Sequence, residues 1–423
     1  MDKLLILGST GRGTTELIKE AKNRGIYTII TDGLSAEQSP VKLIADEYWT
    51  ISTGEVDLLE QKCREEKIGG IINGISTFNI GITMELTKRL GLSCYATPES
   101  WYFTVDKRAF KDICIANRVP VAPDYHVSNP PTEEELDKIK FPVVVKAIDQ
   151  SANRGMSYCF DRSEIGQACD YARSFSKSNT VIIEKMLRGK EYAAWYIMAD
   201  GEVALVDFAA MLNQPGYPSN CYSLTTALDD RRDLFLEEIN PFFMKALKEM
   251  GCKEGLAWIE MMVDEDDNHM YALEMGYRMS GDMMAIPLGK SHNFNIFSWL
   301  VDIAMGVKHT KEELTALDIS SRKDSIACSY ILFSSEGGEI TEINGLEKIS
   351  SIPTVNIDSR LKVGDTIGKH QYLAVITFNA QNYEGICEII SEINRSVSYK
   401  SGENDIAIRY TDFQTLKQMS GSV

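Results

Sequence analysis

The chain has 423 residues, of which 44% are hydrophobic and 25% are charged, a composition typical of globular proteins. A single hydrophobic core stops growing at roughly 250–300 residues, so we expect more than one domain. The formal charge of −17 disfavours nucleic acid and anionic membrane surfaces as partners, because like charges repel.

Nine cysteines are scattered along the sequence without a C-x-x-C pair, which is typical of reduced thiols. No apolar stretch reaches the roughly 18–20 residues that a membrane span needs. The first residues lead directly into an apolar run and a glycine turn rather than into a signal peptide. We therefore expect a cytoplasmic protein.

Strands and helices are expected to alternate over the first ninety residues. Apolar runs at residues 4–7, 27–31 and 70–72 have the length of strands, whereas residues 14–23 and 80–90 have helical spacing. This repetition predicts a parallel sheet with ligand loops at the carboxyl ends of its strands.

A second region begins near Thr97 and is expected to continue into a helix that contains Asp106, Lys107 and Phe110. Residues 141–201 have the pattern strand, loop, strand, helix, strand, strand. Residues 203–306 are expected to hold longer strands and two helices.

The remaining chain is expected to be rich in strands. Apolar runs at residues 326–333, 354–358 and 373–378 predict three of them, and residues 383–393 have the spacing of one helix.

The glycine loop at residues 8–13 follows the first strand and precedes the first helix, and Asp32 ends the next strand. Backbone N–H groups at such a turn suit an anion, and the acid could bind ribose hydroxyls of a nicotinamide cofactor. The spacing is G-x-x-G-x-G, however, whereas dinucleotide sites have G-x-G-x-x-G. A tight first turn of an α/β sheet explains the loop equally well.

The strand at residues 141–146 ends on Lys146, whose ammonium group would need an anion if it were buried. A lysine at the protein surface is the alternative. The following loop, residues 149–156, is small and polar and could fold over phosphates, although an ordinary hairpin turn has the same composition.

Residues 181–187 form a third apolar segment and lead towards Glu191. A strand that continues into an extended linker exposes backbone groups to a purine edge, and Glu191 lies close enough to bind a ribose. A plain edge strand with solvated charges is the alternative.

The strongest signal is a pair of apolar runs, residues 258–263 and 271–275, that each contain one glutamate. The polar residues between them predict a hairpin. If its turn centres on Asp267, Glu260 lies opposite Glu274 with Cβ atoms roughly 4.5–5.5 Å apart, although a slip of one residue would separate them. Opposed carboxylates need a proton or a cation between them, and their oxygens suit Mg²⁺. Arg278 follows and could bind a phosphoryl group or a carboxylate.

The order and spacing of these segments resemble the ATP-grasp superfamily, in particular its carboxylate–amine and L-amino-acid ligases. The sequence is also similar to biotin carboxylase and the carbamoyl-phosphate synthetase large chain. The resemblance implies an α/β and α+β multidomain protein. Its Rossmann-like domain would span residues 1–96, its two-part ATP-grasp domain residues 97–310 with a smaller lobe at about 115–190, and its β-rich C-terminal domain residues 311–423.

The resemblance also implies roles for individual residues. Glu260 and Glu274 would bind metal, and Arg278 and Lys146 would act in catalysis. The residues expected to bind ATP are Lys107, Lys146, Ser151, Arg154, Gly155, Glu184, Lys185, Leu187 and Glu191.

The sequence departs from the family at one position. The family commonly has E-x-N-x-R, with the asparagine as a further metal ligand, whereas this chain has Glu274, Gly276 and Arg278. Asp282 or water would have to replace that ligand. The phosphate loop is also poor in glycine, which favours the ligase branch over the carboxylases.

The activity implied by the resemblance is phosphorylation of a small carboxylate by ATP, followed by attack of an amine and release of ADP. Mg²⁺, or Mn²⁺ in its place, would be the metal, and a homodimer is one expected assembly. Two alternatives remain: an inactive nucleotide-binding homologue, suggested by Gly276, and an NAD-dependent dehydrogenase, suggested by the glycine loop and Asp32.

Overall fold

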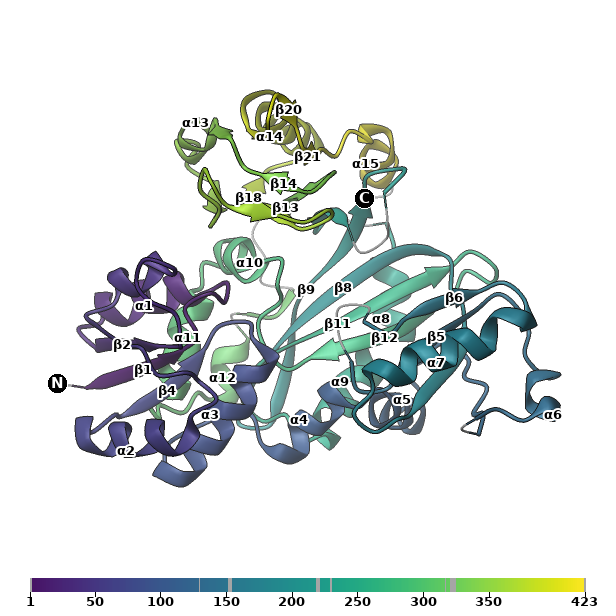
Figure 1. Ribbon diagram of the computed structural model, residues 1–423, viewed down its shortest axis with the longest axis horizontal. Coiled ribbons are helices and arrows are strands. Elements are labelled where there is room, and N and C mark those ends of the chain that lie inside the picture. Colours follow the sequence, from purple (N-terminus) through teal and green to yellow (C-terminus); the bar gives the residue numbers. More distant parts are fainter. Residues whose placement is uncertain are drawn as a thin grey trace.

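The computed structural model describes residues 2–128, 130–150, 154–217, 221–228, 230–315, 317–319 and 325–421. The N-terminal strands lie at one end of the molecule and the small sheet of residues 143–185 at the other (Figure 1). A long central sheet joins these parts, and the C-terminal elements lie above it in this view.

The N-terminal part is a four-stranded parallel sheet in the order β3-β2-β1-β4, which confirms the predicted strand–helix repetition. Its elements are β1 (Lys3–Leu7), α1 (Thr14–Asn23), β2 (Tyr27–Thr31), the short η1 (Pro40–Ile44), β3 (Glu47–Trp49), α2 (Val56–Glu66), β4 (Gly70–Asn73) and α3 (Thr77–Leu90). Helices α2 and α3 cover one face, whereas α1 and the distant α11 (Ile296–Ala304) cover the other. Alternate strand residues are buried on each face, as expected for a sheet between two helical layers.

The region after the N-terminal sheet contains two helices, α4 (Pro98–Val105) and α5 (Lys107–Ala116). The helix that was expected to contain Asp106, Lys107 and Phe110 is α5, but Asp106 lies just before it, because this residue has extended dihedral angles and caps the helix. Its carboxylate accepts a hydrogen bond from the backbone N–H of Ala109 at 2.8 Å. The cap places Lys107 at the first position of α5.

The small sheet is antiparallel, in the order β6-β5-β7. Its elements are α6 (Glu133–Leu136), β5 (Val143–Ala147), β6 (Ser157–Cys159), the short η2 (Arg162–Glu164), α7 (Ile165–Phe175) and β7 (Val181–Lys185). Helix α7 packs its apolar side on β5 and β7 and forms a core separate from that of the central sheet. The predicted order of elements in this region is confirmed.

The central sheet has nine strands in the order β12-β11-β8-β9-β10-β13-β18-β16, with β21 (Ala407–Ile408) also pairing β13. Its members are β8 (Gly189–Ala199), β9 (Glu202–Asn213), β10 (Tyr222–Thr226), β11 (Gly255–Asp264), β12 (Met270–Gly276), β13 (Ile326–Ser334), β16 (Asn356–Asp358) and β18 (Tyr372–Ala380). The β10–β13 pairing carries the sheet across the boundary expected at residues 310/311. That boundary stays a prediction.

Helices cover the central sheet and complete the C-terminal part. The described residues between positions 203 and 306 form four helices rather than the two expected: α8 (Arg232–Glu238), α9 (Asn240–Glu249), α10 (Ala285–His292) and α11. Only Ile239 separates α8 from α9, so the pair has no loop that the sequence pattern would show. The remaining elements are α12 (Lys311–Leu314), β14 (Gly338–Glu339), β15 (Glu342–Asn344), α13 (Leu346–Ser350), β17 (Thr366–Ile367), α14 (Tyr383–Ser396), β19 (Ser398–Ser401), β20 (Asn404–Asp405) and α15 (Phe413–Ser420).

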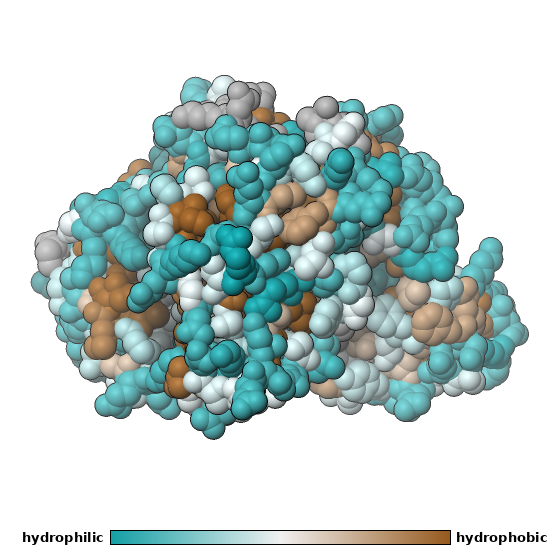
Figure 2. Space-filling model, turned by 90° about the horizontal axis from the view of Figure 1, so that it is seen from above, coloured by the Kyte–Doolittle hydropathy of each residue, from teal (hydrophilic) through white to brown (hydrophobic). Residues whose placement is uncertain are grey.

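The surface seen from above is mostly hydrophilic, with separate apolar patches (Figure 2). This agrees with a content of charged residues that is ordinary for a globular protein. Within the described residues, no helix combines the length and the apolar character that crossing a membrane requires. The nine cysteines are free thiols in the structure, and seven of them are buried.

Candidate active site

Two opposed glutamates lie at the edge of the central sheet. Glu260 on β11 pairs directly with Glu274 on β12, which confirms the predicted register. The pairing shifts after Glu260, because a β-bulge opposes Met261 to Ala272. On the other side of β11, Ala193 of β8 lies opposite Glu260. Since alternate residues share a face, Glu191 lies on the same face as the two acids.

Burial and neighbouring negative charges perturb two of these acids, Glu260 and Glu191. Burial, followed by the charges of Glu274 and Glu191, raises the pKa of Glu260 well above its usual range. Burial and the charge of Glu274 raise the pKa of Glu191 to about 7. Neither Glu260 nor Glu274 accepts a hydrogen bond or forms an ion pair with any residue that the structure describes. A cation between the two would offset this repulsion.

The donor set decides which cation fits. In the described parts of the chain, no group of three or more His, Cys, Asp or Glu side chains could hold a metal ion on its own. Mg²⁺ is commonly held by one or two carboxylates and completes its shell with water and phosphate oxygens. Glu260 and Glu274 therefore fit a magnesium–nucleotide site better than a site made of protein ligands alone.

Arg278 lies beside the acids, just after β12. Its guanidinium lies 5.1 Å from the centre of the Trp258 ring, and its Nη1 donates to the backbone oxygen of Met279 at 2.8 Å. Burial lowers the pKa of Arg278, whereas the carboxylates of Glu274 and Glu260 oppose that shift. The arginine thus lies within electrostatic reach of both acids.

Lys146 on β5 forms an ion pair with Glu184 on the neighbouring β7. Burial alone would lower the pKa of Lys146, but the charge and the hydrogen bond of Glu184 raise it above its usual value. The other carboxylate oxygen of Glu184 accepts from Lys111, which is 5% exposed and also donates to Ala122 O at 2.8 Å. Glu184 therefore holds two lysines through its buried side chain.

Lys111 was not among the residues expected in the site. Its signal was present in the spacing, because Lys111 lies one helical turn after Lys107 on α5. Lys107 donates its Nζ proton to the backbone oxygen of Gln150, next to the expected phosphate loop. Burial lowers the pKa of Lys107, and the charge of Glu274 opposes this. Both Lys107 and Lys146 thus experience the field of Glu274, although they come from different elements.

The expected phosphate loop is only partly described. Ser151 lies outside the described residues, and Arg154 is exposed at the turn that follows. Gly155 has a φ of +71°, and a Cβ added there would lie 3.1 Å from Phe175 Cβ. The backbone conformation therefore favours glycine at this position, and a side chain there would also require Phe175 to shift by a few tenths of an ångström.

The segment after β7 is fixed to the turn of the acidic hairpin. Lys185 forms ion pairs with the fully buried Asp264 and with Asp266 at 3.3 Å. The backbone N–H of Arg188 donates to Asp264 Oδ1 at 3.1 Å, and the N–H of Glu265 donates to Arg188 O at 2.7 Å. The segment that follows β7 is thus held to the hairpin turn through the side chain of Lys185. Leu187 within it is partly exposed.

Asp282, the suggested replacement for the missing metal ligand, has a different function. Its Oδ1 accepts hydrogen bonds from Ser280 Oγ at 2.5 Å and from the N–H of Met284 at 3.1 Å. Its carboxylate is thus used to fix the turn before α10, because those buried polar groups need partners. The suggestion that Asp282 binds metal is not supported by this geometry.

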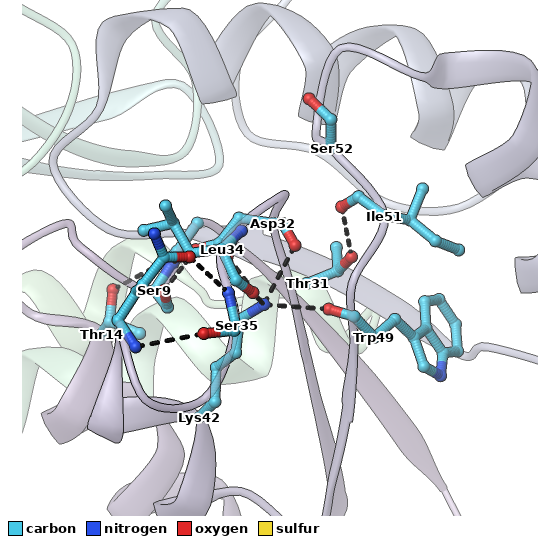
Figure 3. Close-up of polar contacts among 12 residues, drawn as sticks. Ser9, Thr14, Thr31, Asp32, Leu34, Ser35, Lys42, Trp49, Ile51 and Ser52 are labelled. Atoms are coloured by element: carbon cyan, nitrogen blue, oxygen red, sulfur yellow. Dashed lines mark hydrogen bonds and ion pairs between the residues drawn. The ribbon is translucent and has the colours of Figure 1, made fainter.

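The N-terminal glycine loop is fixed by internal contacts (Figure 3). Asp32 Oδ2 accepts from the N–H of Ser9 at 2.7 Å, and Asp32 Oδ1 pairs with Lys42 Nζ at 2.8 Å. Lys42 is fully buried and also donates to Trp49 O at 3.1 Å. Burial alone would raise the pKa of Asp32, but hydrogen bonds from Lys42 and Ser9 lower it below its usual value. Asp32 is therefore engaged in holding the turn, which favours the structural interpretation of this loop.

Comparison with known proteins finds similarity in both sequence and fold. Residues 139–286 match the family model of the ATP-grasp domain. A formate-dependent phosphoribosylglycinamide formyltransferase from Bacteroides thetaiotaomicron is 23% identical over 318 residues, which cover 73% of this chain and 78% of that protein. One from Methanococcus maripaludis is 26% identical over 190 residues, covering 44% of this chain and 48% of that protein.

Solved structures share the fold over nearly the whole chain. An L-amino acid ligase from Bacillus licheniformis has a TM-score of 0.76 at 18% identity, covering 95% of this chain and 99% of that one. A biotin carboxylase complex from Campylobacter jejuni has a TM-score of 0.75 at 16% identity, with coverages of 95% and 92%. The resemblance to the ATP-grasp superfamily is confirmed, and the comparisons agree with the expected ATP-dependent ligase.

Proposed function

We propose that this ATP-grasp protein is an ADP-forming carbon–nitrogen ligase that joins a small carboxylic acid to an amine. The observation that carries the proposal is the pairing of Glu260 with Glu274 on one face of the sheet. The charge of Glu274 acts on Lys107 and Lys146, and both acids act on Arg278. Two carboxylates with cationic side chains close to them suit a polyphosphate and its metal ion.

Each charged group has a role in this proposal. Glu260 and Glu274 hold Mg²⁺, with Mn²⁺ as a substitute, and the ion supplies positive charge that offsets the charge developing on the phosphates. Lys107 and Lys146 bind phosphate oxygens, and Lys146 can do so by exchanging its partner Glu184 for phosphate. The remaining residues assigned to ATP are Ser151, Arg154, Gly155, Glu184, Lys185, Leu187 and Glu191.

Arg278 orients the acid substrate, because a guanidinium binds a carboxylate in a planar, bidentate manner. A carboxylate oxygen attacks the γ-phosphorus of ATP, the bond to the bridging oxygen breaks, and ADP leaves. The amine then attacks the carbonyl carbon of the acylphosphate. Inorganic phosphate leaves with the former carboxylate oxygen, and the nitrogen loses a proton to solvent.

The substrate class is supported by the related proteins. Two of them carry names that state a small carboxylic acid: one is formate-dependent, and another is an L-amino acid ligase. We propose a small carboxylate and a small amine for this chain as well. The domain limits expected at residues 1–96, 97–310 and 311–423, a cytoplasmic location and a homodimer belong to the same proposal.

Oxygen-18 transfer tests the mechanism. Candidate acids labelled in the carboxylate are screened with amines for Mg²⁺-dependent ADP release, and the phosphate from productive pairs is analysed by mass spectrometry. The proposal expects one ¹⁸O in phosphate and ADP as the nucleotide product. Label in AMP would indicate adenylation instead, and unlabelled phosphate alongside confirmed amide would exclude the acylphosphate.

Gly276 favours a second candidate, a nucleotide-binding protein without turnover, because the family's metal-binding asparagine is absent there. Such a protein would bind ATP yet release no ADP with any pair in the screen. Binding of NAD in place of ATP would instead favour a dehydrogenase, which the engaged Asp32 argues against.

A further inference from the structure

The space beside Glu274 is closed by an aromatic ring. Gly276 lies two residues after Glu274 on β12, hence on the same face of the sheet, and pairs with Trp258 of β11. A Cβ added at Gly276 would lie 2.3 Å from Trp258 Cε2, 2.4 Å from Cζ2 and 2.6 Å from Nε1. Non-bonded carbon atoms pack at roughly 3.5–4.0 Å, so no side chain fits at position 276 beside this ring.

Trp258 is held in this place by its neighbours. It is 6% exposed and lies between Gly276 on one side and Trp195 of β8 on the other. The guanidinium of Arg278 lies 5.1 Å from its ring centre, within the range of a cation–π interaction. The ring thus forms a wall of the acidic site and a support for its arginine.

The edge that Trp258 turns towards Gly276 includes its indole nitrogen. This N–H is buried and has no hydrogen-bond partner among the described residues, whereas the neighbouring Trp195 donates to Ser280 Oγ at 3.0 Å. An indole N–H is only a donor, so it cannot ligate a cation, and its positive hydrogen repels one. Trp258 therefore places a hydrogen-bond donor, which repels cations, where a metal ligand would otherwise lie.

No other acid compensates for that missing ligand. Asp282 is occupied by Ser280 and Met284, and the described residues contain no group of three acids, histidines or cysteines placed to hold a metal. We infer that the site holds one divalent cation per bound nucleotide, between Glu260 and Glu274, and that Trp258 sets this number. The inference rests on the proposed function, because it assumes a metal–nucleotide complex at these acids.

Equilibrium dialysis counts the cations directly. The intact protein is dialysed against Mn²⁺ and a radiolabelled, non-hydrolysable ATP analogue, and the excess of each on the protein side is measured. We expect a ratio of one Mn²⁺ per bound nucleotide. A ratio of two would overturn the inference and leave the proposed ligase standing. Bound nucleotide without metal, or no bound nucleotide, would overturn both.

A pair of variants tests the part played by the ring. Trp258→Ala combined with Gly276→Asn makes space for the missing ligand and supplies it, so the ratio should rise to two. Trp258→Phe is the matched control, since a smaller ring still fills much of the space, and the ratio should stay at one. A folded, nucleotide-binding double variant that keeps a ratio of one would show that Trp258 does not set the number. If the double variant fails to fold, the wild-type ratio still decides the count.

Discussion

Replacing Glu191 by glutamine should stabilise the protein at neutral pH while weakening its hold on ATP. Burial and the charge of Glu274 raise the pKa of Glu191 from 4.5 to about 7. Between pH 4.5 and about pH 7, Glu191 binds a proton in the folded state but not in the unfolded state. The free energy of unfolding of the wild-type protein therefore falls as the pH rises through this window. Above pH 7 both states are ionised and this contribution becomes constant.

The size of the effect follows from the shift. Moving a carboxyl pKa from 4.5 to about 7 corresponds to about 3 kcal/mol, an upper value because solvent reaches part of the group. Glutamine cannot ionise and keeps a similar shape. The difference in stability between Glu191→Gln and wild type should therefore increase from pH 5 to pH 8, reaching several degrees in melting temperature.

Thermal unfolding at pH 5, 6, 7 and 8, without nucleotide, measures this difference. Glu403→Gln, on an exposed turn, serves as the control for loss of one negative charge and should show no such trend. Because Glu191 is assigned to the ribose, the variant should also bind ATP more weakly in calorimetry. A difference that does not change with pH would refute the electrostatic reasoning, and unchanged ATP affinity would refute the ribose assignment.

Three further predictions concern other parts of the chain. Glu274→Gln should lower kcat by about 100-fold or more without lowering the melting temperature, because half of the metal site is lost while a repulsive charge is removed. Glu265→Gln on the exposed hairpin turn should retain activity in the same assay. Lys185→Ala should weaken ATP binding and lower the free energy of unfolding by about 3–5 kcal/mol, because the buried Asp264 loses its partner. Adding Asp264→Asn should restore the free energy of unfolding, because no buried charge is then left without a partner. A double variant that is as unstable as Lys185→Ala would contradict this explanation. Alkylation at pH 8 should modify the partly exposed Cys94 and Cys387 first. The buried thiols should react more slowly, because burial raises the pKa of Cys63, Cys252 and Cys328 to about 12. Rapid labelling of all nine thiols in the folded protein would contradict this, because it would show that reagent reaches the hydrophobic cores.

The sequence predicted the central feature of the site because that feature is local. The register of Glu260 against Glu274 depends only on where one turn lies, and the polar composition of residues 264–270 fixed that turn. The β-bulge after Glu260 was not predictable, because nothing in the alternation of residues 258–263 marks an extra residue on the partner strand. It leaves the two acids opposed.

Contacts between segments that are far apart in the chain could not be predicted from the sequence. Glu184 was assigned to the nucleotide from its place in a motif, but its pairing with Lys146 and Lys111 depends on how β5 and α5 lie against β7. The role of Trp258 could not be predicted either, because in the sequence it resembles any other apolar residue of a strand. Only the pairing of β11 with β12 shows that its ring explains the glycine at position 276.

The cover of the N-terminal sheet has a consequence for biosynthesis. One face of that sheet is closed in part by α11, which contacts α1 and β4. Helix α11 follows β4 by about 220 residues, or roughly 10–45 s at common rates of translation. During that interval the nascent sheet lacks this cover over its apolar face, which includes Ile72 of β4. Chaperones that bind extended apolar segments should therefore engage this chain on the ribosome until α11 has emerged and docked.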